Sequence, residues 1–171
     1  MKKLLMTAAL LVVGATAFGA ASAPVSVSLN VVETSQLVLM DGGQQLGQID
    51  LIHPQILLST AKNTNTPSMV KQNFKVQTGD GSVIKVSGTD ATTLTYTLDG
   101  VTQGTGALTL VGANGSSLPS TLKLTVDSET ISSASEGSQN AIVSTIAPNE
   151  LNKLTAAGTF TASATLKVTA S

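Results

Sequence analysis

Hydrophobic residues recur at every second position through most of the chain, which is the period of a β-strand with one face on a core. Tight-turn sequences separate these stretches, for example Asp99-Gly100 and Asn114-Gly115, where glycine accepts the positive φ of a hairpin. A short helical turn is expected at residues 149–154. The pattern predicts about ten strands, at residues 25–32, 37–40, 46–52, 69–77, 83–87, 94–98, 107–111, 122–126, 141–146 and 159–169.

The number and spacing of these stretches predict an all-β fold. Many short strands, with no ten-residue helical pattern to connect parallel neighbours, favour an antiparallel β-sandwich over an α/β fold. The chain has 171 residues, of which 11% are charged and 2% aromatic. This length suits one domain with a single core, and the low charge disfavours long amphipathic helices.

The first 23 residues have the pattern of a secretory signal peptide. Lys2 and Lys3 precede an apolar stretch at residues 4–13, and small residues follow at 15–23. Cleavage is expected after Ala21 or Ala23. The apolar stretch is shorter than the roughly 20 residues that span a bilayer, which disfavours an uncleaved anchor. The mature chain is expected to be exported through the periplasm.

Charge and cysteine content exclude several classes of function. Removal of the first 23 residues leaves seven lysines against ten acidic residues, a net charge of −3, which argues against a nucleic-acid partner. The chain has no cysteine, so it can form neither a disulfide nor a thiolate metal site. Its stability must come from packing and backbone hydrogen bonds.

The two ends of the mature chain carry the most distinctive alternation. The first strand has one wholly apolar series, consisting of Val25, Val27, Leu29 and Val31. The last strand follows Gly158 and has the apolar series Phe160, Ala162, Ala164, Leu166 and Val168. From the pattern alone, the first segment is either an edge strand of its own sandwich or a strand that inserts into a groove of another subunit. A one-residue slip would turn its polar series inward, so the alternation defines the register of either arrangement.

The mature chain resembles the major fimbrial subunits of the chaperone-usher pathway, in the alpha class of the colonization-factor-antigen type. The resemblance covers the alternating start at residues 25–31, the segments 37–43 and 46–52, the central stretch 73–78 and the ending 157–169. The chain departs from the family pattern at Glu33-Thr34, where a proline is usual, and at Ala170, where other pilins have an aromatic residue.

The resemblance implies an immunoglobulin-like sandwich that lacks its last strand and is completed by donor-strand exchange. Residues 24–32 would be the donor strand and residues 33–171 the pilin domain, with the series from Gly158 to Val168 facing the acceptor groove and the chaperone. Burial of four aliphatic side chains, at about 1.5–3 kcal/mol each, would make this a strong joint. The implied partners are other copies of the chain in an extracellular fimbria, a periplasmic chaperone, an outer-membrane usher, a tip adhesin and, as a further candidate, a host receptor.

No catalytic, cofactor or metal site is predicted. The single histidine, His53, precedes Pro54 and is interpreted as a loop or strand-end residue, because no nucleophile-elbow sequence accompanies it. One alternative function is a self-contained secreted binding module or minor tip adhesin with its first strand paired internally. A second alternative is a periplasmic hydrolase with a carboxylate pair, for which Asp41 and Asp50 are the residues to test.

Overall fold

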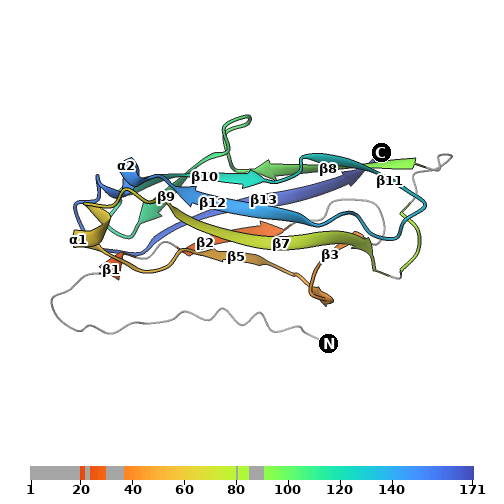
Figure 1. The fold of residues 1–171 in the computed structure, drawn as a ribbon, viewed down its shortest axis with the longest axis horizontal. Helices are drawn as coiled ribbons and strands as arrows, with labels where there is room; N and C mark the ends of the chain where they lie inside the picture. The colour runs from red at the N-terminus through yellow and green to blue at the C-terminus, as the bar shows by residue number, and fades with distance from the viewer. Residues whose placement is uncertain (1–19, 22–23, 30–36, 80, 85–90) are drawn as a thin grey trace.

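The computed structural model describes residues 20–21, 24–29, 37–79, 81–84 and 91–171, the first two ranges as backbone (Figure 1). Most of residues 1–23 therefore lie outside the described part, as do Val31 and residues 85–90. The described residues are mostly in strands that run along the long axis of the body, with two single-turn helices at one end. The predicted all-β, sandwich-like fold is confirmed.

The elements follow one another along the chain with short connections. They are β1 (Ala20–Ala21), β2 (Pro24–Leu29), β3 (Leu37–Asp41), β4 (Gln44–Gln45), β5 (Ile49–Ile52), β6 (Ile56–Leu57), α1 (Leu58–Ala61), β7 (Ser68–Thr78), β8 (Ala91–Asp99), β9 (Ala107–Gly112), β10 (Ser117–Leu124), β11 (Ser128–Ser132), β12 (Asn140–Ile146), α2 (Pro148–Leu151) and β13 (Phe160–Ala170).

Period-two alternation located most of these strands, and the differences have local causes. The helical turn at 149–154 is confirmed as α2, whose first residue is Pro148. Residues 46–48 and 83–84 are not in strands, although both segments were predicted to be. β10 begins at Ser117, five residues before its predicted start. This early part can contain Pro119, which has no amide hydrogen, because pairing with β12 begins only at Thr121. β11 was not predicted, since Ile131 is its one apolar residue.

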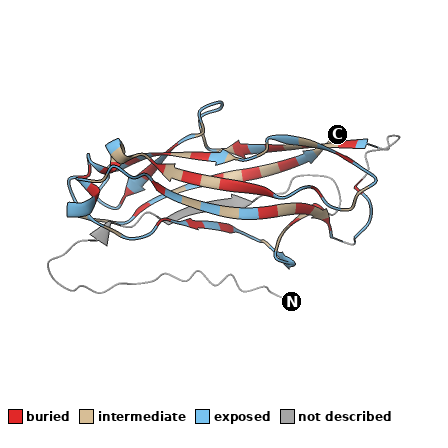
Figure 2. Ribbon diagram, viewed as in Figure 1, coloured by how far each residue is buried: buried red, intermediate tan, exposed pale blue. Residues whose placement is uncertain are grey.

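The sheet folds over at β13, which joins two layers. The first two residues of β13 pair with β9, whereas its last six pair with β8. One layer therefore has the order β11-β8-β13-β2-β5, and the other continues from β9 through β10, β12, β7 and β3 to β4. Burial alternates along each long strand (Figure 2), so the core lies between the layers. At its centre Phe74 packs edge-on against Tyr96, with ring centroids 6.0 Å apart.

In the described ranges, no buried side-chain nitrogen or oxygen lacks a hydrogen-bond partner, which keeps the desolvation cost low. The Tyr96 hydroxyl donates to Glu129 Oε1 at 2.5 Å, and the Ser138 amide donates to Glu129 Oε2 at 2.8 Å. Burial raises the pKa of Tyr96, and the Glu129 carboxylate raises it further. Burial alone would raise the pKa of Glu129, but the hydrogen bonds from Tyr96 and Ser138 outweigh it and lower that pKa. These bonds hold the edge strand β11 against β8.

Gly106 allows the β8–β9 connection to approach β10. Its φ is +69°, and a Cβ there would lie 2.4 Å from the carbonyl oxygen of Leu122, whose amide donates to Gly106 O at 2.7 Å. Gly104 has a similar φ of +80°, but a Cβ there would meet nothing within 4 Å. The two glycines therefore differ in crowding and not in backbone conformation.

We expect Gly106→Ala to lower the free energy of unfolding by about 3 kcal/mol or more, because it adds a backbone clash to the cost of a positive φ. Gly104→Ala is the matched control and should cost only about 1–2 kcal/mol. Chemical denaturation of both variants measures the difference. Equal losses would show that Gly106 is required for its φ alone.

Candidate functional site

The most distinctive site is a slot between β5 and β13 that the backbone of β2 fills. β2 pairs with β5 in the antiparallel sense and with β13 in the parallel sense. β5 and β13 have no direct pairing, and within the described residues β5 has no other strand partner in the sheet. Removal of β2 would therefore open the layer and leave β5 as a detached edge.

The register places the apolar series of β2 opposite buried residues of both walls. Val25 pairs with Leu51 and Ala162, and Val27 pairs with Ile49 and Ala164. Leu29 pairs with Leu166. Apart from Ala162, which is half-buried, all of these wall residues are buried.

The polar series of β2 is registered with the outward-facing positions of the walls. Ser26 pairs with the exposed residues Asp50 and Ser163, and Ser28 pairs with Thr165. Because residues directly opposite one another share a face of the sheet, the sequence alternation and the observed register agree. Val31 lies outside the described residues.

The predicted series of the last strand lies on the core side of β13. Phe160, Ala164, Leu166 and Val168 are buried, and Ala162 is half-buried. Gly158 precedes β13 by two residues and is half-buried, so it lies outside the strand whose start it was predicted to mark.

The sandwich was expected to lack one strand, but in the single chain the sheet is complete. Residues 37–171 leave the slot between β5 and β13 open, but β2 of the same copy occupies it. The segment predicted to leave its own domain thus completes its own sheet when no second copy is present. The parallel direction of the β2–β13 pair was not predicted from the sequence.

His53 is buried and hydrogen-bonded, although its sequence context predicted only a loop or strand-end residue. It directly follows β5, and its imidazole is only 2% exposed. Nδ1 lies 2.8 Å from Ser68 Oγ on β7, and Nε2 lies 2.8 Å from Ser144 Oγ on β12. Burial lowers the pKa of His53. The spacing of two from Ile49 and Leu51 could have indicated this inward position.

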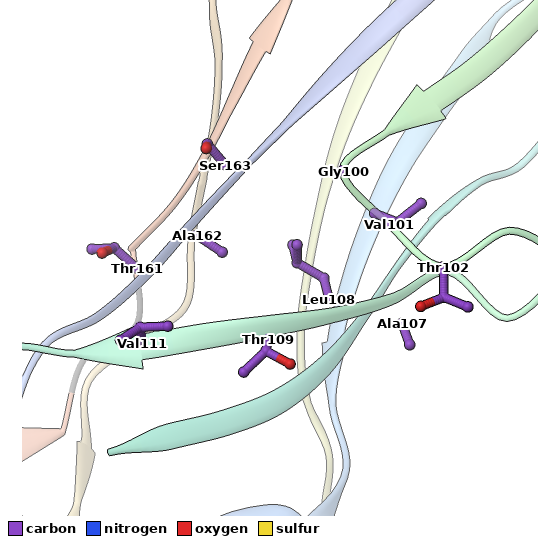
Figure 3. A pocket seen from close by; sticks show the side chains of 10 residues that line it. All are labelled: Gly100, Val101, Thr102, Ala107, Leu108, Thr109, Val111, Thr161, Ala162 and Ser163. Atoms are coloured by element: carbon purple, nitrogen blue, oxygen red, sulfur yellow. The ribbon is translucent and has the colours of Figure 1, made fainter. Parts of the chain in front are cut away.

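A shallow hollow of about 510 Å³ lies on the other edge of β13, where that strand passes from β9 to β8 (Figure 3). Gly100 lines it and approaches β13 closely, since a Cβ there would be 3.3 Å from Ser163 O. Leu108 and Val111 of β9 line the opposite side. None of the ten lining residues is acidic, basic or histidine, so the hollow offers no acid–base group.

The carboxylates named for a hydrolase lie on different strands and each has an amide partner. Asp41 Oδ2 accepts from Gln72 Nε2 at 2.6 Å, and Asp50 Oδ1 accepts from Gln48 Nε2 at 2.5 Å. Across the ranges given above, the structure contains no cluster of three His, Cys, Asp or Glu residues suited to a metal ion. No helix within those ranges is both long and apolar enough to cross a membrane.

No protein-family model and no curated protein matches this chain. The functional interpretation therefore depends on the slot itself.

The register predicts that cysteines at positions 26 and 50 will form a disulfide within one molecule. Ser26 and Asp50 are a directly opposed antiparallel pair, whose Cα atoms are about 4.5–5.5 Å apart, within the disulfide range. The chain contains no other cysteine. When an added oxidant accepts the two electrons, the Ser26→Cys/Asp50→Cys monomer should therefore lose the mass of two hydrogen atoms and remain monomeric.

Ser28→Cys/Asp50→Cys is the matched control, because its cysteines are offset by two residues and about 7–8 Å apart. It should oxidise slowly in comparison. Equal oxidation of the two variants would contradict the register of β2 in the slot.

Proposed function

We propose that this chain is a structural subunit of a bacterial surface fibre, a fimbrial major subunit that polymerises by donor-strand complementation. In the fibre, the donor strand of one copy, residues 24–32, occupies the slot between β5 and β13 of the next copy. The observation that carries this proposal is that, among the described strands, β2 alone joins β5 to β13, in a register that matches its sequence alternation to the buried and outward-facing positions of both strands.

The geometry of the slot supports exchange between copies because nothing in the fit requires the strand to come from the same chain. β2 makes two backbone ladders and matches its apolar series to Leu51, Ile49, Ala164 and Leu166. The identical segment of a second copy can make the same ladders in the same register. The two arrangements therefore differ in connectivity and chain entropy, not in the interactions inside the slot.

The slot also accommodates a strand of either direction. β5 and β13 run antiparallel to one another, since β2 is antiparallel to the first and parallel to the second. A reversed strand would be parallel to β5 and antiparallel to β13, so the number of parallel ladders stays the same. The stretch Val25-Ser-Val-Ser-Leu-Asn-Val31 has apolar residues at alternate positions when read from either end. A neighbour can therefore insert its segment from either end of the slot.

The proposal includes the partners that such assembly requires. A body with an open slot exposes the buried faces of β5 and β13, which is a hazard for aggregation before assembly. A periplasmic chaperone would cover the slot, and an outer-membrane usher would exchange that cover for the next copy. On this proposal the immunoglobulin-like sandwich is the body, and the assembled fibre is extracellular and supports adhesion.

The rival function is a self-contained secreted module. The pairing of β2 within its own copy is compatible with that rival, and it is also the arrangement expected of a lone subunit with no second slot available. The two functions differ in what happens when many copies meet: a subunit exchanges strands, whereas a module stays monomeric. The proposal is favoured by the position of the segment at the start of the mature chain, where it can leave without unthreading the body.

Leu29→Asp should abolish fibre growth while leaving export intact. The substitution puts a charge opposite Leu166, which is fully buried, and burial of an unpaired carboxylate costs several kcal/mol. Electron microscopy of the cell surface and unboiled detergent gels provide the measurement, because a strand-exchanged fibre should survive detergent as a ladder until it is heated.

Ser28→Asp is the matched control, since Ser28 belongs to the polar series and pairs with Thr165. It adds the same charge one position away and should leave fibres and ladders in place. Full-length fibres from Leu29→Asp, or a single unboiled band from the unmodified chain, would refute the proposal.

A further inference from the structure

β5, which forms one wall of the slot, has few attachments besides β2. β5 has four residues, and on its side away from β2 it has no ladder within the described residues. On the opposite layer, β5 lies near β7. When the slot is empty, β5 must be held by other contacts if the slot is to keep its width.

His53 supplies such a contact at the end of β5. Its two ring nitrogens lie 2.8 Å from the hydroxyls of Ser68 and Ser144, which belong to neighbouring strands of the opposite layer. One side chain thus connects the slot wall to both β7 and β12. All three side chains are buried, so water does not compete for these bonds.

Within the part of the chain that the structure describes, no charged group faces the imidazole from the elements around it. β5 carries Asp50 and β7 carries Lys71 and Lys75, but all three lie on the outward-facing series of their strands and are exposed or half-exposed. β12, β6 and α1 contain no charged residue, and neither does β2. A protonated His53 would therefore have hydroxyl partners but no counter-ion.

We infer that His53 is the positioning residue that anchors β5, one wall of the slot, to the opposite layer. Protonation of His53 weakens this anchor and with it the grip of the slot, by which we mean the stability of the inserted strand between β5 and β13. The inference concerns regulation of the slot, and it rests on the proposed function only in treating a neighbour's strand as the natural occupant. The same grip acts on the chain's own β2 and can be measured there.

The direction of the pH effect follows from the buried state of the ring. Burial lowers the pKa of His53 in the closed wall, whereas a loosened wall exposes the ring to water and restores a pKa near 6.5. The anchor is therefore fully effective above about pH 6.5 and is lost as the pH falls below that value, until the lowered pKa is reached. One proton gives up to a tenfold change in the opening equilibrium per pH unit.

Hydrogen exchange of the purified single chain tests this inference without any fibre. Between pH 7.5 and 5.5, the protection factors of the β2 and β5 amides should fall, by at most about tenfold. Global unfolding also exposes His53, so amides of β8 and β11 that exchange only through it should fall by the same factor from a higher protection, whereas those that exchange by local opening should not change. Equal protection factors in β2, β5 and β8 at both pH values would show that the slot opens only with the whole molecule and would overturn its separate loosening.

His53→Gln is the conservative variant, because an amide can also donate to one serine and accept from the other but does not titrate. It should keep the protection of β2 and β5 at pH 7.5 and show a change below about twofold at pH 5.5. The same fall in His53→Gln as in the unmodified chain would overturn the inference. Should that variant fail to fold, a pH titration of the imidazole NMR signal in the unmodified chain tests the inference instead. The signal can be assigned without ambiguity because His53 is the only histidine. Titration near or above pH 6.5 would contradict a buried anchor.

These outcomes are separable from those of the fibre assays. Slot protection that depends on pH, in a chain that never forms fibres, would refute the proposed function and leave the anchor in place. Fibres from a chain whose slot does not respond to pH would do the reverse.

Discussion

The fold depends on one joint, the insertion of β2 between β5 and β13. Every other strand of the two layers is held by hairpin neighbours or by long ladders, such as the seven-residue register between β7 and β12. β5, in contrast, belongs to its layer only through β2 and to the opposite layer through packing and His53. The strand that closes the layer is also the first strand of the two layers in chain order. On the proposed function, it is the strand that another copy supplies.

The physical basis of the joint is the agreement between side-chain alternation and backbone register. Val25, Val27 and Leu29 are registered with buried wall residues, while Ser26 and Ser28 are registered with outward-facing ones. Backbone ladders alone would permit several registers, but a slip of one residue would bring hydroxyl groups to the core side. The joint is therefore specific in register, even though the antiparallel walls accept either direction of the strand.

Most of the strands could be predicted from period-two alternation because each has one face on the core. The exceptions are explained by their side chains. In β11 only Ile131 faces the core, and the early part of β10 contains Pro119, which lacks an amide donor but precedes the pairing with β12. The apolar series of β2 and β13 could also be read from the sequence. The pairing of β2 with β13 could not, because it joins segments more than 130 residues apart, and neither could the pairing of β2 with β5, because both depend on tertiary contacts. His53 was interpreted as a loop or strand-end residue. Its hydrogen bonds to Ser68 and Ser144 could not be predicted, because no sequence pattern distinguishes these two serines from the many others in the chain.

Whose strand fills the slot is the central question, and mixed-isotope cross-linking answers it most directly. Fibres would be grown in reducing conditions from equal amounts of ¹⁵N-labelled and unlabelled chains with cysteine at position 50 and at either 26 or 28, which covers both strand directions. After oxidation and digestion, mass spectrometry would identify the linked peptide pairs. Exchange between copies predicts that half of the pairs contain one labelled and one unlabelled peptide. Pairs of a single isotope only would show that each chain keeps its own strand, and would contradict the account.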